Sequence, residues 1–118
     1  MDFLTSNEIQ LRPGDVDYGV EFEFPVTTSG VPNSGTIPYG VSISSVTVTG
    51  YYGDSAASDL ISGSPSVTGD DIVNVNLNYP STTLSGVTRV SNLGLKFILV
   101  LDNGTEADLR YDNIIARP

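Results

Sequence analysis

LGLKFILVLDNGTEADLRYDNII, residues 93–115, decides the fold of this 118-residue chain. The apolar run 97–101 is followed by Asp102-Asn103-Gly104 and then by a segment that alternates apolar and polar residues. Two such runs joined by a short glycine-containing turn are typical of a β-hairpin. The stretch therefore predicts an all-β fold.

The register of this hairpin follows from burial. A two-residue Asn-Gly loop would pair Leu99 with Asp108, whereas a three-residue loop with Gly104 in the left-handed region pairs Leu99 with Ala107. Because a one-residue slip exchanges the two faces of a strand, burial favours the second register. That register also pairs Leu101 with Thr105, Phe97 with Leu109 and Leu95 with Tyr111.

Other segments predict further strands. Alternation favours strands over residues 8–12, 18–24, 41–51 and 72–79, with a short edge strand near 87–90. The alternation in residues 41–51 changes phase at Ser44-Ser45, which predicts a β-bulge there. The best helical candidate is one turn within residues 54–61. We expect a buried core formed by Tyr18, Val20, Phe22, Phe24, Val73, Val75, Leu77, Leu95, Phe97, Leu99 and Leu109.

The strand spacing predicts an immunoglobulin-like, two-sheet antiparallel β-sandwich of about seven strands. The Cys-Trp-Cys signature of antibody domains is missing, so the prediction concerns architecture alone. We expect one domain over residues 8–118, preceded by a short N-terminal arm at residues 1–7. Two long loops, 26–40 and 54–69, interrupt the strand pattern, and loops of that length are often binding elements.

Composition excludes several classes of function. The net charge of −9 with only five Lys and Arg argues against binding to nucleic acid. Cysteine is absent, so neither disulfides nor thiolate chemistry are expected. The opening MDFLTSNEIQ lacks a basic flank and an apolar core, so we expect no secretion signal. No apolar run approaches the length of a membrane span.

The residues needed for common catalysis are missing as well. Without His or Cys there is no familiar triad and no zinc site, and no phosphate-binding glycine motif is present. Neighbouring carboxylates such as Asp15 with Asp17 are best interpreted as solvated side chains. Whether Asp70 and Asp71 bind calcium stays open, because no Asp-x-Asp-x-Asp-Gly loop is present. We expect no enzymatic activity and no cofactor.

Four segments carry a resemblance to a known family: RPGDVDY at 12–18, ISSVTV at 43–48, VNVNL at 73–77, and the closing hairpin to Ile115. Together they resemble small immunoglobulin-like virion proteins of tailed bacteriophages. The chain departs from that pattern in its two long loops and in an acidic pair where Trp is common after the tyrosine strand. The resemblance implies a capsid cement or decoration protein on the outside of the virion, made in the host cytoplasm. Its implied partner is the major capsid protein or another virion protein.

Two other interpretations remain: a component of the neck, tail or fibres, or a sandwich that binds carbohydrate or another surface. A homo-oligomer also stays open. Contacts with a partner are expected from the N-terminal arm, from the loop 26–40 and from exposed tyrosines. These residues are Phe3, Leu4, Val31, Pro32, Ile37, Tyr39, Tyr51 and Tyr52.

Overall fold

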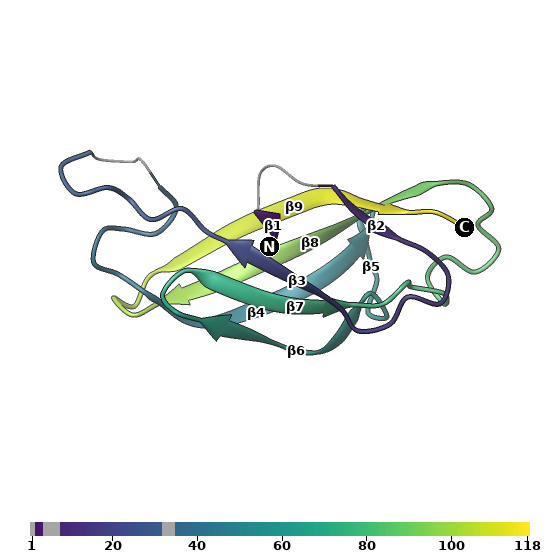
Figure 1. The fold of residues 1–118 in the computed structure, drawn as a ribbon, viewed down its shortest axis with the longest axis horizontal. Helices are drawn as coiled ribbons and strands as arrows, with labels where there is room; N and C mark the ends of the chain where they lie inside the picture. The colour runs from purple at the N-terminus through teal and green to yellow at the C-terminus, as the bar shows by residue number, and fades with distance from the viewer. Residues whose placement is uncertain (1, 4–7, 32–34) are drawn as a thin grey trace.

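The computed structural model describes residues 2–3, 8–31 and 35–118, and for residues 2–3 it describes the backbone alone. These residues form nine strands in two sheets, without a helix (Figure 1). The molecule is elongated, with principal extents of 51 × 24 × 23 Å. The all-β prediction is therefore confirmed, and the two sheets are arranged as in a β-sandwich.

The four-stranded sheet has the order β1 (Asp2–Phe3), β3 (Tyr18–Glu23), β7 (Ile72–Leu77), β6 (Ile61–Thr68). The five-stranded sheet has the order β2 (Ile9–Leu11), β9 (Glu106–Ala116), β8 (Ser91–Leu101), β4 (Ile43–Tyr52), β5 (Ser55–Ala56). The β1–β3 and β2–β9 pairs are parallel, and the remaining pairs are antiparallel.

The β8–β9 hairpin has the predicted register. Leu99 pairs with Ala107 and Phe97 with Leu109. The Gly104 amide donates to the Leu101 carbonyl at 3.0 Å, and Gly104 has a φ of +85°. In this register Phe97 and Leu99 are fully buried, which is the burial that the argument from the sequence required.

Two bulges adjust the five-stranded sheet. The β4–β8 register shifts between Ile43 and Ser45, which confirms the bulge predicted at Ser44-Ser45. A second shift in β8–β9, between Leu93 and Leu95, was not predicted. A Cβ added to Gly94 would lie 2.4 Å from Oδ1 of Asp112, so a larger residue at the bulge of β9 over β8 would displace the Asp112 side chain.

The core lies between the sheets and is centred on aromatic rings. The Phe97 ring centroid is 4.9 Å from that of Phe22 and 5.3 Å from that of Phe24, and Tyr111 packs edge-on against Phe22. The predicted core is confirmed except at Tyr18, which is 44% exposed because it begins β3 at the end of the sheet. Leu109 is partly buried.

The segment 54–69 was predicted wrongly. It forms no helical turn, and instead contains β5 and the eight-residue strand β6. Gly63 and Pro65 obscure the strand pattern, but β6 lies at the edge of its sheet, where proline is tolerated. The register of β6 against β7 shifts between Ser62 and Ser66, which accommodates both residues.

The edge strand predicted near 87–90 is also wrong, because residues 81–86 form consecutive turns and the chain enters a strand only at Ser91. The Leu84 amide donates to the Pro80 carbonyl, and the Val87 amide donates to the Leu84 carbonyl, both at 2.9 Å.

Part of the expected N-terminal arm is paired. Asp2 lies opposite Phe22 and Phe3 opposite Glu23, so the first described residues extend the four-stranded sheet. Residues 4–7 of the arm lie outside the described residues.

Candidate functional site

One loop extends beyond both sheets at the end that also carries the β8–β9 turn (Figure 1). We call residues 25–42 the projecting loop. We call its neck the place where residues 25–27 meet residues 35–37, and backbone hydrogen bonds close it. The amides of Thr36 and Ile37 donate to the Pro25 carbonyl at 2.8 and 3.0 Å, and the Thr27 amide donates to the Ile37 carbonyl at 2.7 Å. A Cβ at Gly35 would lie 2.5 Å from the Val26 carbonyl carbon, so the two arms approach as closely as glycine allows.

Ile37 anchors this loop and is not available to a partner. Its side chain is fully buried and belongs to the hydrophobic core. The prediction that Ile37 contacts a partner is therefore wrong. The reason is the closed neck, which turns residue 37 back toward the core.

The outer part of the projecting loop exposes apolar side chains. Tyr39 is 67% exposed and Val31 is 52% exposed. Both line a shallow hollow of about 220 Å³ together with Thr27, Thr28, Ser29 and Gly30. No residue from 25 to 42 carries a charge. This surface can bury apolar area against another molecule, and its polar side-chain groups are the hydroxyls of Thr27, Thr28, Ser29 and Tyr39.

Acidic turns support the base of the projecting loop. The Phe24 amide donates to the Asp71 carbonyl and the Asp102 amide to the Ser42 carbonyl, both at 2.9 Å. The Ser42 hydroxyl donates to Oδ1 of Asp70 at 2.9 Å. We call Asp70, Asp71, Asp102 and Glu106 the acidic rim. The carboxylates therefore lie at the base of the uncharged loop.

Tyr51 lies toward the opposite end of β4 and is held within the molecule. The Arg110 guanidinium lies 4.8 Å from the centre of its ring. Arg110 also donates from Nε to Oδ1 of Asp112 at 2.7 Å and from Nη2 to the Gly53 carbonyl at 3.1 Å. The hydrogen bond to Asp112 raises the pKa of Arg110 above its ordinary value. Tyr51 therefore supports this arginine.

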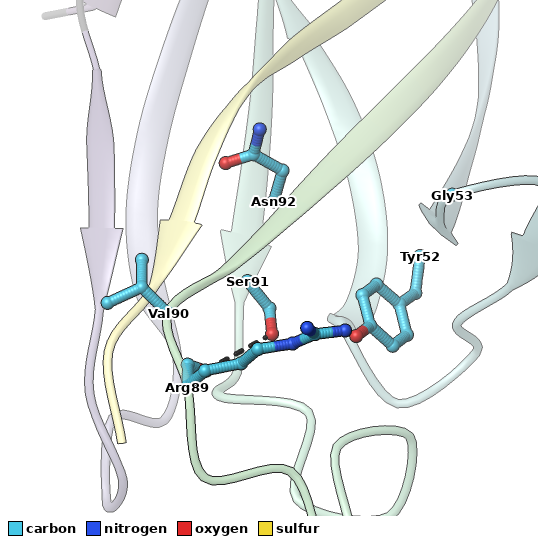
Figure 2. Close-up of a pocket in the computed structure, with 6 residues that line it drawn as sticks. All are labelled: Tyr52, Gly53, Arg89, Val90, Ser91 and Asn92. Atoms are coloured by element: carbon cyan, nitrogen blue, oxygen red, sulfur yellow. Dashed lines mark hydrogen bonds between the residues drawn. The ribbon is translucent and has the colours of Figure 1, made fainter.

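Tyr52 lines a larger pocket at the same end (Figure 2). The pocket has a volume of about 480 Å³ and is lined by Tyr52, Gly53, Arg89, Val90, Ser91 and Asn92. We call it the Arg89 pocket. Ser91 is buried, and its hydroxyl donates to the Arg89 carbonyl at 3.3 Å, which fixes the backbone beside the pocket.

Asp59 holds the loop that leads into this pocket. Its carboxylate accepts the amides of Thr82 and Thr83 at 2.9 and 3.1 Å, and also the Thr83 hydroxyl. Burial raises the pKa of Asp59, but the hydrogen bonds from Thr83 and Thr82 outweigh burial and hold the pKa below its ordinary value. Sequence reasoning missed this contact, because more than twenty residues separate the partners and no local pattern marks it.

Asp59 joins two segments that are distant in the sequence, and we call such a carboxylate a latch. A second latch, Asp17, lies at the same end. Asp17 has a φ of +52°, its amide donates to the Asn78 side chain at 2.9 Å, and its carboxylate accepts the Ser62 hydroxyl. Aspartate tolerates this backbone region better than most residues, which explains its presence in the turn before β3. Asn78 thus has a structural role, because its side chain accepts the Asp17 amide.

The eight predicted contact residues do not come together. Val31 and Tyr39 share the projecting loop, whereas Tyr51 and Tyr52 lie at the opposite end of β4. Phe3 belongs to β1, of which the backbone alone is described, and Leu4 and Pro32 lie outside the described residues. The structure therefore offers two separate surfaces.

Over residues 2–3, 8–31 and 35–118, no three residues among His, Cys, Asp and Glu are grouped so that they could hold a metal ion. In the same part of the chain, no helix is long and apolar enough to cross a membrane. No protein-family model matches this sequence, and no curated protein matches it.

Proposed function

We propose that this chain is a non-enzymatic structural protein of a phage virion, which binds the outer capsid surface as a cement or decoration protein. The observation that carries the proposal is the projecting loop, whose neck is closed and whose tip exposes Val31 and Tyr39. A loop whose neck is already held by hydrogen bonds loses less conformational entropy when it docks. The resemblance of the sequence to small virion proteins supplies the class of partner.

We further propose that the sandwich is immunoglobulin-like. In that fold, strands B, E and D are neighbours in one sheet, and strands C, F and G in the other. Here β3-β7-β6 and β4-β8-β9 have the corresponding orders along the chain. In this assignment the projecting loop joins strands B and C, at one end of the sandwich.

The acidic rim defines the partner surface. An uncharged loop with Asp70, Asp71, Asp102 and Glu106 around its base fits an apolar depression whose surroundings carry Lys or Arg on the shell. The charged part of such a contact speeds association and weakens with salt, whereas the apolar part does not depend on salt in this way. A subunit that touches two neighbouring capsid proteins also gains effective concentration, so that weak contacts together stabilise the shell.

Quantifying the protein in purified particles tests the proposal. We expect about one copy of this protein for every one to a few subunits of the major capsid protein. We also expect particles lacking the protein to be less resistant to heat or osmotic shock. A handful of copies per virion would favour the neck, tail or fibre interpretation instead. Unchanged resistance of particles lacking the protein would contradict the cement role.

A further inference from the structure

The Arg89 pocket lies at the end of the molecule opposite the projecting loop, between the last residues of β4 and the segment that enters β8 (Figure 2). Tyr52 closes one side, because it is paired with Leu93 in β8 and with Ser55 in β5. On the other side the Ser91 hydroxyl holds the Arg89 carbonyl. Both walls of the pocket are therefore fixed by the five-stranded sheet.

The Arg89 guanidinium is exposed, and no carboxylate among the described residues lies within ion-pair distance of it. Arg12, Lys96 and Arg117 likewise form no ion pair with the described residues, so what distinguishes Arg89 is its place in a pocket beside Tyr52. Arg110, on the same sheet, is paired with Asp112 at 2.7 Å. Figure 2 shows the Arg89 side chain extending across the pocket toward the Tyr52 ring.

Tyr52 offers a second donor. Its ring is partly buried against the core and lines the pocket, and its hydroxyl forms no hydrogen bond with the described residues. A guanidinium and a phenolic hydroxyl thus lie at one open pocket, and both are available to an acceptor. A planar guanidinium matches a carboxylate through two parallel N–H···O bonds, and a tyrosine hydroxyl can add a third.

We propose that the Arg89 pocket binds a carboxylate of a partner protein, presented by a Glu or Asp side chain or by a chain terminus. The pocket is open on one side, whereas sites for small molecules enclose most of the ligand surface. An open hollow suits a side chain that its own protein holds in place. The proposal concerns a different end of the molecule from the projecting loop and does not depend on the capsid assignment.

Amide chemical-shift mapping on the full-length protein tests this proposal. The probes are a capped pentapeptide with one central glutamate, its glutamine counterpart, and penta-alanine as free acid and as amide. We expect the two carboxylate peptides to shift the amides of Gly53, Arg89 and Asn92, with half-saturation at about millimolar concentration. The Gln and amide peptides should produce no saturable shift.

Variants inside and outside the Arg89 pocket show where the carboxylate peptides bind. Arg89→Gln should abolish the shifts and Tyr52→Phe should weaken them, whereas Arg117→Gln, an exposed arginine outside the pocket, should leave them unchanged. Equal shifts with acidic and neutral peptides, or equal loss in the Arg117 variant, would overturn the proposal. Glucuronate that binds more tightly than either acidic peptide would overturn the assignment to a protein partner.

Discussion

The two ends of this molecule use the same kinds of residue for different purposes. At the end opposite the projecting loop, carboxylates hold the chain: Asp59 binds the turn at Thr82 and Thr83, and Asp17 accepts the Ser62 hydroxyl. At the other end, the projecting loop is closed mainly by backbone hydrogen bonds and anchored by buried Ile37, and a carboxylate contributes only through the exposed contact of Asp70 with the Ser42 hydroxyl.

This difference shows how the acidic composition should be interpreted. Part of the charge of −9 is structural, because each latch carboxylate satisfies backbone amides or hydroxyls that would otherwise need water. Asp70, Asp71, Asp102 and Glu106, by contrast, lie on or beside the turns at the end of the molecule that carries the uncharged projecting loop. Composition alone does not distinguish a carboxylate that stabilises a turn from one that faces a partner.

The largest expected effect comes from the core that both ends share. Phe97→Ala should lower the free energy of unfolding by about 3–5 kcal/mol, because Phe97 is fully buried against Phe22 and Phe24. Chemical denaturation followed by circular dichroism measures this loss. If the ends share one core, amide exchange should accelerate at both of them together. Loss of protection at one end alone would show that the ends unfold separately.

The next effect separates the anchor of the projecting loop from its tip. Ile37→Ala should cost about 2–4 kcal/mol, since it empties a fully buried site at the loop neck. The matched control is Val31→Ala, at an exposed position of the same loop, which should change stability by less than about 0.5 kcal/mol. Equal effects of the two substitutions in urea denaturation would contradict the anchored-loop description.

The hairpin turn beside the projecting loop gives a third effect. Gly104→Val should cost about 1–3 kcal/mol, because a β-branched side chain is strained at a φ of +85°. Gly104→Asn should cost less, since asparagine tolerates the left-handed region. Thermal unfolding of the two variants side by side checks this order. The reverse order would reject the turn geometry.

The smallest stability effect tests the carboxylate latch at the opposite end. Asp59→Asn should cost about 1 kcal/mol at neutral pH, because an amide can replace only part of what the carboxylate accepts. The folded pKa of Asp59 lies below its unfolded value of 3.8, so its contribution is present above about pH 4 and is lost as pH falls through the folded pKa.

The stability difference between the wild type and Asp59→Asn should therefore be constant near neutrality and shrink in acid. Asp54→Asn, on an exposed turn, serves as the control and should show neither effect. A difference that grows as pH falls would contradict the assignment of Asp59 as a latch.

The hairpin was predictable because its determinants are local. The apolar run and Gly104 lie within a few residues, and only one register buries Phe97 and Leu99. The bulge at Ser44-Ser45 was predictable for the same reason, since a break in alternation is visible within one strand. In these places the local sequence and the tertiary fold require the same arrangement.

What could not be predicted depends on distant partners. β6 contains Gly63 and Pro65 and becomes a strand because β7 pairs with it. The sequence predicted an exposed loop residue at Ile37, but the hydrogen bonds of its backbone with Pro25 and Thr27 turn its side chain toward the core. The candidate surfaces divide in the same way: exposure at Val31 and Tyr39 was inferred from the loop, whereas the Arg89 pocket requires β4 and β8 to lie side by side.

The proposal that the projecting loop is the docking element is tested most directly by adding purified protein back to particles that lack it. Bound protein is measured by sedimentation for the wild type, for the double variant Val31→Ser with Tyr39→Ser, and for the control Val16→Ser. Val16 is 70% exposed at the opposite end. We predict that the double variant binds about tenfold more weakly or worse, whereas the control binds like the wild type. A double variant that binds like the wild type, with binding lost in the Val16 variant, would contradict the assignment.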